Sequence, residues 1–362
     1  MQGGPGTSSL LAFFSEHGPY RMNEDGDLVR RPFAWTERFS VVYVDQPVGT
    51  GFSFTESKRG YARNMRDVGR DMLEFLEQFF TIFDHLSSNA FYIAGESYAG
   101  KYVPAVTAAI HRNADKLQVN INLKGVAIGN GFTAPATMTD YGPLLLQLGL
   151  VGKKEATHMT RMHQRAVRLL KQGRGAASFD IMDSLFFGIL NENTYFRRVT
   201  GFHFYYNLLN SVPPAGMRSY KTIVQIPHVR RAIHVGDRPF SANRTVVMTS
   251  FKKNFMFSEK SLFKLALENY KVLVFSGMLD ICVPTVGTEK FLDELRWPGR
   301  QQWAQAERKP WVRADGEVLG YVKTARNLSF VAVRGAGHMV PFDKPKFAYN
   351  MISRFFYQLP LV

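Results

Sequence analysis

Three residues of the sequence have the types and the chain order needed for nucleophilic catalysis: Ser97, Asp280 and His338. A serine hydroxyl becomes a good nucleophile when a histidine removes its proton, and a carboxylate orients that histidine and stabilises its charged form. Each of the three residues directly follows a short apolar run that predicts a strand. Any one of them alone would be read as an ordinary loop or cap residue, but together they predict a serine triad.

The alternatives within the sequence are weak. Among the other eight histidines, only His234, in "RRAIHVG", has a comparable loop context, and no strand-end acid matches it. Acyl transfer also needs two N–H donors for the developing oxyanion. The residue after the nucleophile, Tyr98, supplies one, and the glycine-rich run at 2–6 is a candidate for the second because glycine permits close backbone approach.

The elements that must position these residues alternate along the chain. Apolar runs bounded by glycine predict strands at 38–47, 90–95, 123–131, 270–280 and 328–338. Apolar residues at helical spacing predict helices over 65–83 and 99–110, with the second bent early by Pro104. Buried runs separated by helices indicate a mostly parallel sheet covered on both faces. With the order Ser, Asp, His, this predicts an α/β-hydrolase fold.

The strand pattern stops between about 133 and 225, where the chain is helical in pattern and basic. We therefore expect a core in two parts, 1–132 and 226–362, with a helical cap inserted at 133–225. A separate second domain is the alternative. Within the insertion, Lys153–Arg174 predicts an amphipathic helix with a basic outer face. A solvated helix face is the simpler interpretation of this charge, and an anion-binding or membrane-surface role is the other.

Composition narrows the classes of function. The chain is 45% hydrophobic and 21% charged, which is typical of a folded globular protein, and its formal net charge is +15. The excess charge is scattered and nothing resembles a nucleic-acid-binding motif, so no nucleic acid is expected as partner. No apolar run is long enough for a membrane helix. Cys282 is the single cysteine, which excludes an intrachain disulfide, while sequons at Asn243 and Asn327 are candidates for glycosylation.

Six motifs, in order along nearly the whole chain, identify a family. The sequence resembles serine carboxypeptidases, most closely the vitellogenic-like ones, through "QGGPGTSS", "YVDQPVGTGFSF", "GESYAGKYVPA", "GNGF", "SGMLD" and "GAGHMVP". The resemblance implies removal of one residue from a peptide C-terminus, without a metal or an organic cofactor. It assigns the triad to Ser97, Asp280 and His338, and the oxyanion donors to the backbones of Gly4 and Tyr98.

The resemblance also implies a site for the substrate's terminal carboxylate, made of Gln2, Gly3, Glu16 and Glu96. Two carboxyls held close together cannot both ionise cheaply, so we expect them to share a proton that binds the carboxylate best at acidic pH. Met339, beside the histidine, is expected to contribute to the pocket for the leaving residue.

The sequence departs from the family pattern in two places. Thr7 stands where many members have a disulfide cysteine. The chain also begins one residue before the glycine loop, without the strands and the signal peptide that precede it in the family. We therefore expect an N-terminally truncated chain with an exposed sheet edge, which would make it unstable alone. Its complete parent would be secreted or lysosomal.

The sequence predicts a serine-type carboxypeptidase whose substrates are peptide or protein C-termini. An acyltransferase or esterase on the same scaffold is one alternative, and the predicted glutamic acid pair argues against it. An inactive truncated chain with a binding role is the other. The oligomeric state does not follow from the sequence.

Overall fold

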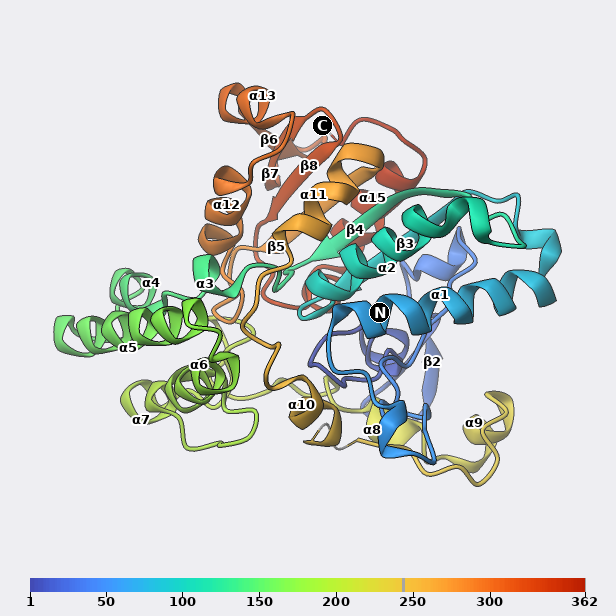
Figure 1. The fold of residues 1–362 in the computed structure, drawn as a ribbon, viewed down its shortest axis with the longest axis horizontal. Helices are drawn as coiled ribbons and strands as arrows, with labels where there is room; N and C mark the ends of the chain where they lie inside the picture. Colours follow the sequence, from blue (N-terminus) through green and yellow to red (C-terminus); the bar gives the residue numbers. More distant parts are fainter. Residues whose placement is uncertain (243–244, 362) are drawn as a thin grey trace.

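A mixed six-stranded sheet forms the centre of the molecule (Figure 1). The computed structural model describes residues 1–242 and 245–361. The strands lie in the order β3-β4-β5-β8-β7-β6, and neighbours from β3 to β8 run parallel while β7 and β6 are antiparallel. Their bounds are β3 Phe91–Glu96, β4 Leu123–Gly129, β5 Lys271–Gly277, β6 Arg308–Val312, β7 Val318–Ala325 and β8 Leu328–Val333.

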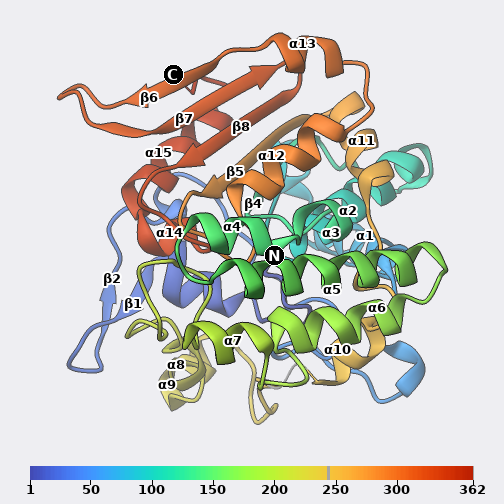
Figure 2. The ribbon, with the colours of Figure 1, turned by 90° about the vertical axis from the view of Figure 1, so that its left-hand side faces the viewer.

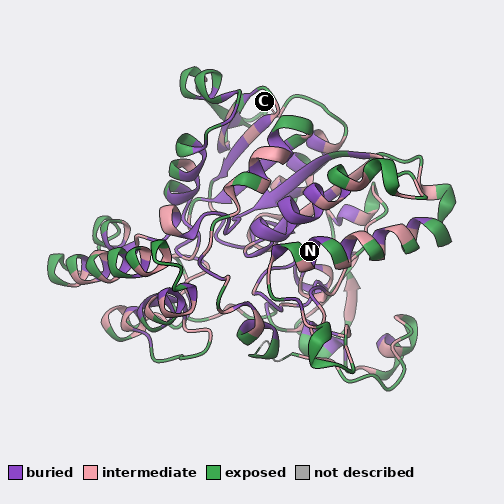
Figure 3. Cartoon of the chain, viewed as in Figure 1, coloured by how far each residue is buried: buried purple, intermediate pink, exposed green. Residues whose placement is uncertain are grey.

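Both faces of the sheet are covered, as expected from the continuous apolar strands (Figure 3). Val272 and Val274 of β5 belong to the larger core cluster, with α1, α2, α11 and α12, whereas Leu273 and Phe275 belong to a second cluster with α15. Alternate residues of one strand therefore pack on opposite faces. These helices are α1 Met65–Ile82, α2 Ala99–Asn113, α11 Lys260–Asn269, α12 Thr285–Glu294 and α15 Pro345–Phe356.

The residues described between β4 and β5 form helices and loops, with one isolated antiparallel bridge from Ser241 to Gly51. Figures 1 and 2 show α4 to α7 projecting to one side of the sheet. The helices before α11 are α3 Pro135–Met138, α4 Tyr141–Gln147, α5 Lys153–Lys171, α6 Gly175–Met182, η6 Asp183–Phe187, α7 Tyr195–Thr200, α8 Tyr220–Ile223, α9 Pro227–Ala232 and α10 Thr245–Phe251. The proposed end of the cap at 225 falls between α8 and α9, and this division stays a prediction.

Helix α5 is the predicted amphipathic helix. Ala156, Met159 and Ala166 are buried on its inner face, and its lysines and arginines are exposed. Across the described residues, no helix is long and apolar enough to cross a membrane.

Short elements complete the fold. They are η1 Ala12–His17, β1 Tyr20–Met22, β2 Leu28–Arg30, η2 Trp35–Glu37, η3 Lys58–Gly60, η4 Asp84–Leu86, η5 Ala114–Lys116, α13 Arg300–Gln305 and α14 Val340–Asp343. Strands β1 and β2 form an antiparallel hairpin apart from the main sheet.

The prediction of a strand at 38–47 was wrong, because residues 40–46 form no hydrogen-bonded pairing with a neighbouring strand among the described residues. A cavity of about 560 Å³, lined by Val41 to Val44 on one side and by β3 on the other, separates this segment from the sheet edge. Met1 hydrogen-bonds to β3: its α-amino group donates to the Ala94 carbonyl at 2.9 Å, and the Glu96 N–H donates to the Met1 carbonyl at 3.2 Å. An apolar run forms a strand only where a neighbouring strand supplies its hydrogen bonds.

Because the central strands are buried, we expect a cavity among them to lower the stability of the fold strongly. Leu273 is fully buried in β5, so Leu273→Ala should lower the free energy of unfolding by about 2–5 kcal/mol. Urea unfolding followed by far-UV circular dichroism measures this change. Leu359→Ala is the matched control, because that leucine is 52% exposed and its loss should change stability by less than about 0.5 kcal/mol. Equal effects of the two substitutions would contradict the packing described here.

Candidate active site

Ser97 lies on the tight turn between β3 and α2. Its φ of +62° is in the left-handed region, which a residue with a side chain rarely adopts. The turn is held from both sides by the end of β4: the Ser97 N–H donates to the Gly129 carbonyl at 2.9 Å, and the Phe132 N–H donates to the Ser97 carbonyl at 2.8 Å. Such over-determined backbone strain is typical of functional positions.

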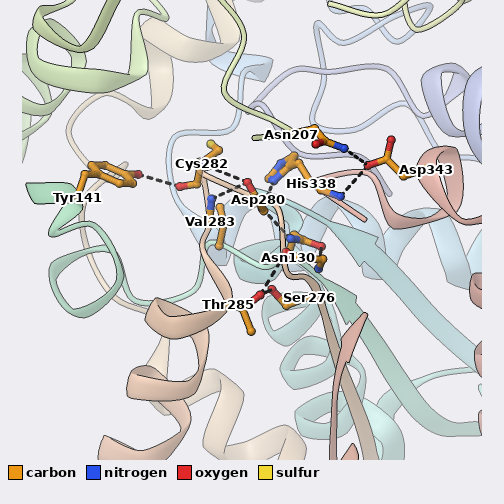
Figure 4. Close-up of polar contacts among 12 residues, drawn as sticks. Asn130, Tyr141, Asn207, Ser276, Asp280, Cys282, Val283, Thr285, His338 and Asp343 are labelled. Atoms are coloured by element: carbon orange, nitrogen blue, oxygen red, sulfur yellow. Dashed lines mark hydrogen bonds and ion pairs between the residues drawn. The ribbon is translucent and has the colours of Figure 1, made fainter. Parts of the chain in front are cut away.

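Asp280 follows β5 and is enclosed by hydrogen-bond donors (Figure 4). One carboxylate oxygen accepts from the backbone N–H groups of Cys282 at 2.7 Å and Val283 at 3.1 Å. The other accepts from Asn130 Nδ2 at 2.6 Å and pairs with His338 Nδ1 at 2.6 Å. The side chain is buried, and four donors compensate the cost of removing its charge from water.

His338 follows β8, and its ring lies against the acid. Because Nδ1 donates to Asp280, the neutral ring carries its lone pair on Nε2, the tautomer that a general base for serine requires. Nε2 is buried and has no hydrogen-bond partner among the described residues. The structure therefore brings the predicted acid and base together. It describes no hydrogen bond between Ser97 and His338 within residues 1–242 and 245–361.

The glycine loop lies directly against the nucleophile turn. A Cβ added to Gly3 would stand 2.3 Å from the Tyr98 nitrogen and 2.8 Å from the Ser97 Cβ, so only glycine fits. The next residue, Gly4, has a φ of +114°. The half-buried carboxylate of Asp45 anchors the loop, accepting from Ser8 Oγ at 2.6 Å and from the Ser9 N–H at 3.0 Å. The sequence reasoning missed this anchor.

Two further carboxyls, Glu16 and Glu96, are buried beside this loop. They are 1% and 7% exposed, respectively. Gln2 Nε2 donates to Glu16 Oε1 at 2.6 Å. Burial raises the pKa of both carboxyls, and the charge of Glu16 raises the pKa of Glu96 further. The structure thus assembles Gln2, Glu16 and Glu96, which lie far apart in the sequence.

The groups around this pair act on it in opposite directions. The pKa of Glu16 is lowered by a hydrogen bond with Glu96 and by the electrostatic influence of His338, Arg31 and the Met1 α-amino group. The charge of Asp280 raises the pKa of Glu96, and the Met1 α-amino group lowers it. For both carboxyls the effect of burial is the largest of these influences.

Asn130 is the second residue that the sequence reasoning missed. It follows β4 with a φ of +43°, donates to Asp280, and accepts from the Gly277 N–H at 3.2 Å. Its position between two glycines, in "GNG", was the available signal, since asparagine tolerates the left-handed conformation.

The remaining predicted residues are placed as follows. Met339 is buried in an apolar cluster with Phe204 and Met217. Asn327 lies half-buried in the turn between β7 and β8, where its Nδ2 donates to the Leu267 carbonyl at 3.1 Å. Asn243 lies outside the described residues. Cys282 is a half-buried thiol that forms no disulfide, since it is the single cysteine. The described residues contain no cluster of His, Cys, Asp and Glu that could hold a metal ion.

A mostly parallel sheet with serine, aspartate and histidine at the ends of its strands defines the α/β-hydrolase class. Comparison with known proteins refines this class, because a family model described as serine carboxypeptidase matches residues 1–358. The chain therefore belongs to the serine carboxypeptidase family and is a hydrolase that acts on peptides.

Curated relatives support this conclusion. The venom serine carboxypeptidase of Apis mellifera is 42% identical over 98% of this chain and 76% of its own length. The probable serine carboxypeptidase CPVL of Homo sapiens is 40% identical over 99% of this chain and 76% of its own. The vitellogenic carboxypeptidase of Aedes aegypti is 37% identical over 98% and 75%.

A solved structure agrees with the fold. The Kex1 prohormone-processing carboxypeptidase of Saccharomyces cerevisiae superposes with a TM-score of 0.82 and 26% identity, covering 99% of this chain and 82% of that one. The α/β-hydrolase fold expected from the strand pattern is confirmed.

The contact of the glycine loop with the nucleophile turn generates a test. Gly3→Ala should lower kcat/KM by about 100-fold or more, because the added methyl must push the loop away from Tyr98. Hydrolysis of a blocked dipeptide measures the loss. Gly152→Ala is the control, since a Cβ there meets only the end of the Glu155 side chain. Full activity of Gly3→Ala would show that the loop does not need this close approach.

Proposed function

We propose that this protein removes single residues from peptide C-termini, with Ser97 as nucleophile and His338 as general base. One observation carries the proposal: the hydrogen-bonded pair of Asp280 and His338 stands near two buried carboxyls with raised pKa values. A serine hydrolase needs only the first feature. The second provides a group that can recognise the free carboxylate that distinguishes a peptide's C-terminus from its interior.

The chemistry proceeds in two halves. His338 Nε2 takes the proton of Ser97 Oγ, which attacks the last peptide carbonyl, while Asp280 stabilises the resulting imidazolium. The N–H groups of Gly4 and Tyr98 are the proposed donors to the oxyanion. The imidazolium then protonates the leaving amino acid. Water attacks the acyl-enzyme with the same base, releasing the shortened peptide and regenerating the serine.

Recognition of the terminal carboxylate depends on the shared proton of Glu16 and Glu96. While one carboxyl is protonated it can donate a hydrogen bond to the substrate's carboxylate, assisted by Gln2 and the Gly3 N–H. As the pH rises, the pair loses that proton. Both carboxyls are then negatively charged, and they repel each other and the substrate's carboxylate. Binding should therefore weaken above the ordinary glutamic acid pKa, in the range to which burial has raised the pair.

The same shifts affect stability. A carboxyl whose pKa is higher in the folded than in the unfolded protein favours folding below the unfolded pKa of about 4.3. That contribution is lost as the pH rises through the folded-state pKa. Both the stability and the substrate affinity should therefore favour acidic conditions, consistent with a secreted or lysosomal location, which we propose for this enzyme.

The free C-terminus and Ser97 provide the direct test of function. An N-blocked dipeptide with a free C-terminus should be cleaved, and its C-terminal amide should be cleaved far more slowly. Ser97→Ala should lower kcat by about 10³-fold or more on the free acid. Equal cleavage of acid and amide would favour an esterase-like or acyltransferase site, and activity independent of Ser97 would remove the proposal.

The glutamic acid pair has its own test. Glu96→Gln keeps a neutral hydrogen-bond donor at every pH, so KM should stay nearly constant between pH 5 and 8, where that of the wild type rises. The variant should also be more stable than the wild type at neutral pH, because it removes a carboxyl whose ionisation opposes burial. Michaelis–Menten kinetics and thermal melting across that range measure both effects. A wild-type KM that does not change with pH would contradict the shared proton.

A further inference from the structure

Residues 205–208 lie between the loops that carry Asp280 and His338. The Ile281 N–H donates to the Tyr205 carbonyl at 3.2 Å, and the Leu208 N–H donates to the Leu279 carbonyl at 2.8 Å. These two bonds flank Asp280 in the chain. This segment of the insertion therefore holds the acid loop by its backbone on both sides of the acid itself.

The same segment holds the histidine loop. The His338 N–H donates to the Tyr206 carbonyl at 2.6 Å, and the Tyr206 ring stacks on the imidazole with centroids 4.8 Å apart and planes 20° apart. The approach is close, since a Cβ added to Gly337 would stand 2.2 Å from the Tyr206 oxygen and 2.8 Å from the Asn207 Cβ. Tyr206 thus contacts the predicted base through both its backbone and its side chain.

Asn207 ties this segment to the other end of the histidine loop. Its Nδ2 donates to Asp343 Oδ2 at 2.9 Å, and the same oxygen accepts from the Gly337 N–H at 2.7 Å (Figure 4). Its Oδ1 accepts from the Leu209 N–H at 3.0 Å. Asn207 is only 6% exposed. Both Nδ2 and Oδ1 of Asn207 are therefore hydrogen-bonded. The Asp343 carboxylate, which follows His338 in the chain, also binds the N–H of Gly337, which directly precedes it.

We propose that Asn207 is a positioning residue for serine activation, acting through Asp343 and Tyr206 to fix His338 relative to Asp280. General-base catalysis requires the imidazole to be placed within a fraction of an ångström, and the three loops involved are far apart in sequence. The segment 205–208 contacts both the acid loop and the base loop, and Asn207 provides its side-chain bond to the base loop. The inference rests on the proposed roles of Ser97 and His338.

A fluorophosphonate probe reports on serine activation without the carboxylate site. Ser97 Oγ displaces fluoride from phosphorus while His338 accepts the serine proton, so the rate of labelling measures how well the base is placed. Asn207→Ala should lower both this rate and the kcat for the blocked dipeptide by about 10- to 100-fold, with KM changed less than about threefold. Mass spectrometry of the labelled peptide confirms that Ser97 is the modified residue.

Variants of the partner separate positioning from general damage. Asp343→Ala should lower both rates as much as Asn207→Ala, and the double variant should be no worse than either single one, because both remove one shared link. Asp343→Asn retains an oxygen that can accept both N–H groups, so it should keep most of the activity. Asn207→Asp preserves size but places two acceptors face to face, and it should lose activity like the alanine variant.

Asn254→Ala is the matched control. Asn254 Nδ2 also joins the region between β4 and β5 to the core, by donating to the Arg63 carbonyl at 2.9 Å, but it contacts neither triad loop. Asn207→Ala would overturn the proposal if it melts at a lower temperature yet labels and turns over like Asn254→Ala. Absence of Ser97 labelling in the wild type would instead refute the triad assignment, which distinguishes the two failures.

Discussion

The buried contact between Asp280 and His338 is the constraint on which the rest of the site depends. A carboxylate in a region without water is costly unless every oxygen lone pair finds a donor. Here the donors come from its own loop, from Asn130 after β4 and from His338 after β8. The order β4-β5-β8 makes this possible, because parallel neighbours bring the carboxyl ends of their strands to one edge. The donors that compensate the buried charge of Asp280 therefore depend on this order of strands.

The protein places buried carboxyls in two contrasting environments only a short distance apart. Asp280 is surrounded by donors, so its ionised form is stabilised and can orient a histidine. For Glu16 and Glu96, burial raises the pKa values, and the pair favours sharing a proton. A fixed negative charge suits the proposed chemistry at the serine. A removable proton suits the proposed recognition of a substrate that is itself an anion.

The region between β4 and β5 also helps to position residues of the proposed site. Residues 205–208 hydrogen-bond to the loops of both Asp280 and His338. The sheet and the region between β4 and β5 therefore both fix the position of the acid relative to the base. The glycine loop is held independently by Asp45. The parts of the proposed reaction are thus supported by different segments. A change in the insertion is expected to affect the base before it affects the oxyanion donors.

The sequence by itself determined the class of the protein and predicted the triad residues that we propose. Strand-forming runs ending at Ser97, Asp280 and His338 are local signals, and the parallel order of their strands follows from the helices between them. Local signals also predicted α1, α2 and α5 closely. They could not show whether the apolar run at 38–47 would have a partner strand, and no strand among the described residues pairs with it. Strands β6 and β7 were not predicted, because exposed β6 residues hide the alternation.

Only the tertiary structure decided the contacts between residues distant in sequence. The bond from Asn130 to Asp280 spans 150 residues, and that from Asn207 to Asp343 spans 136. Their residue types carry no signal on their own, since asparagine in a loop usually bonds its own backbone. The pairing of Glu16 with Glu96 was expected from family resemblance, whereas the burial of both carboxyls is a property of the folded chain. Composition and periodicity indicate the secondary structure that each segment favours. The free-energy cost of burying a polar group depends instead on which hydrogen-bond partners the fold brings to it.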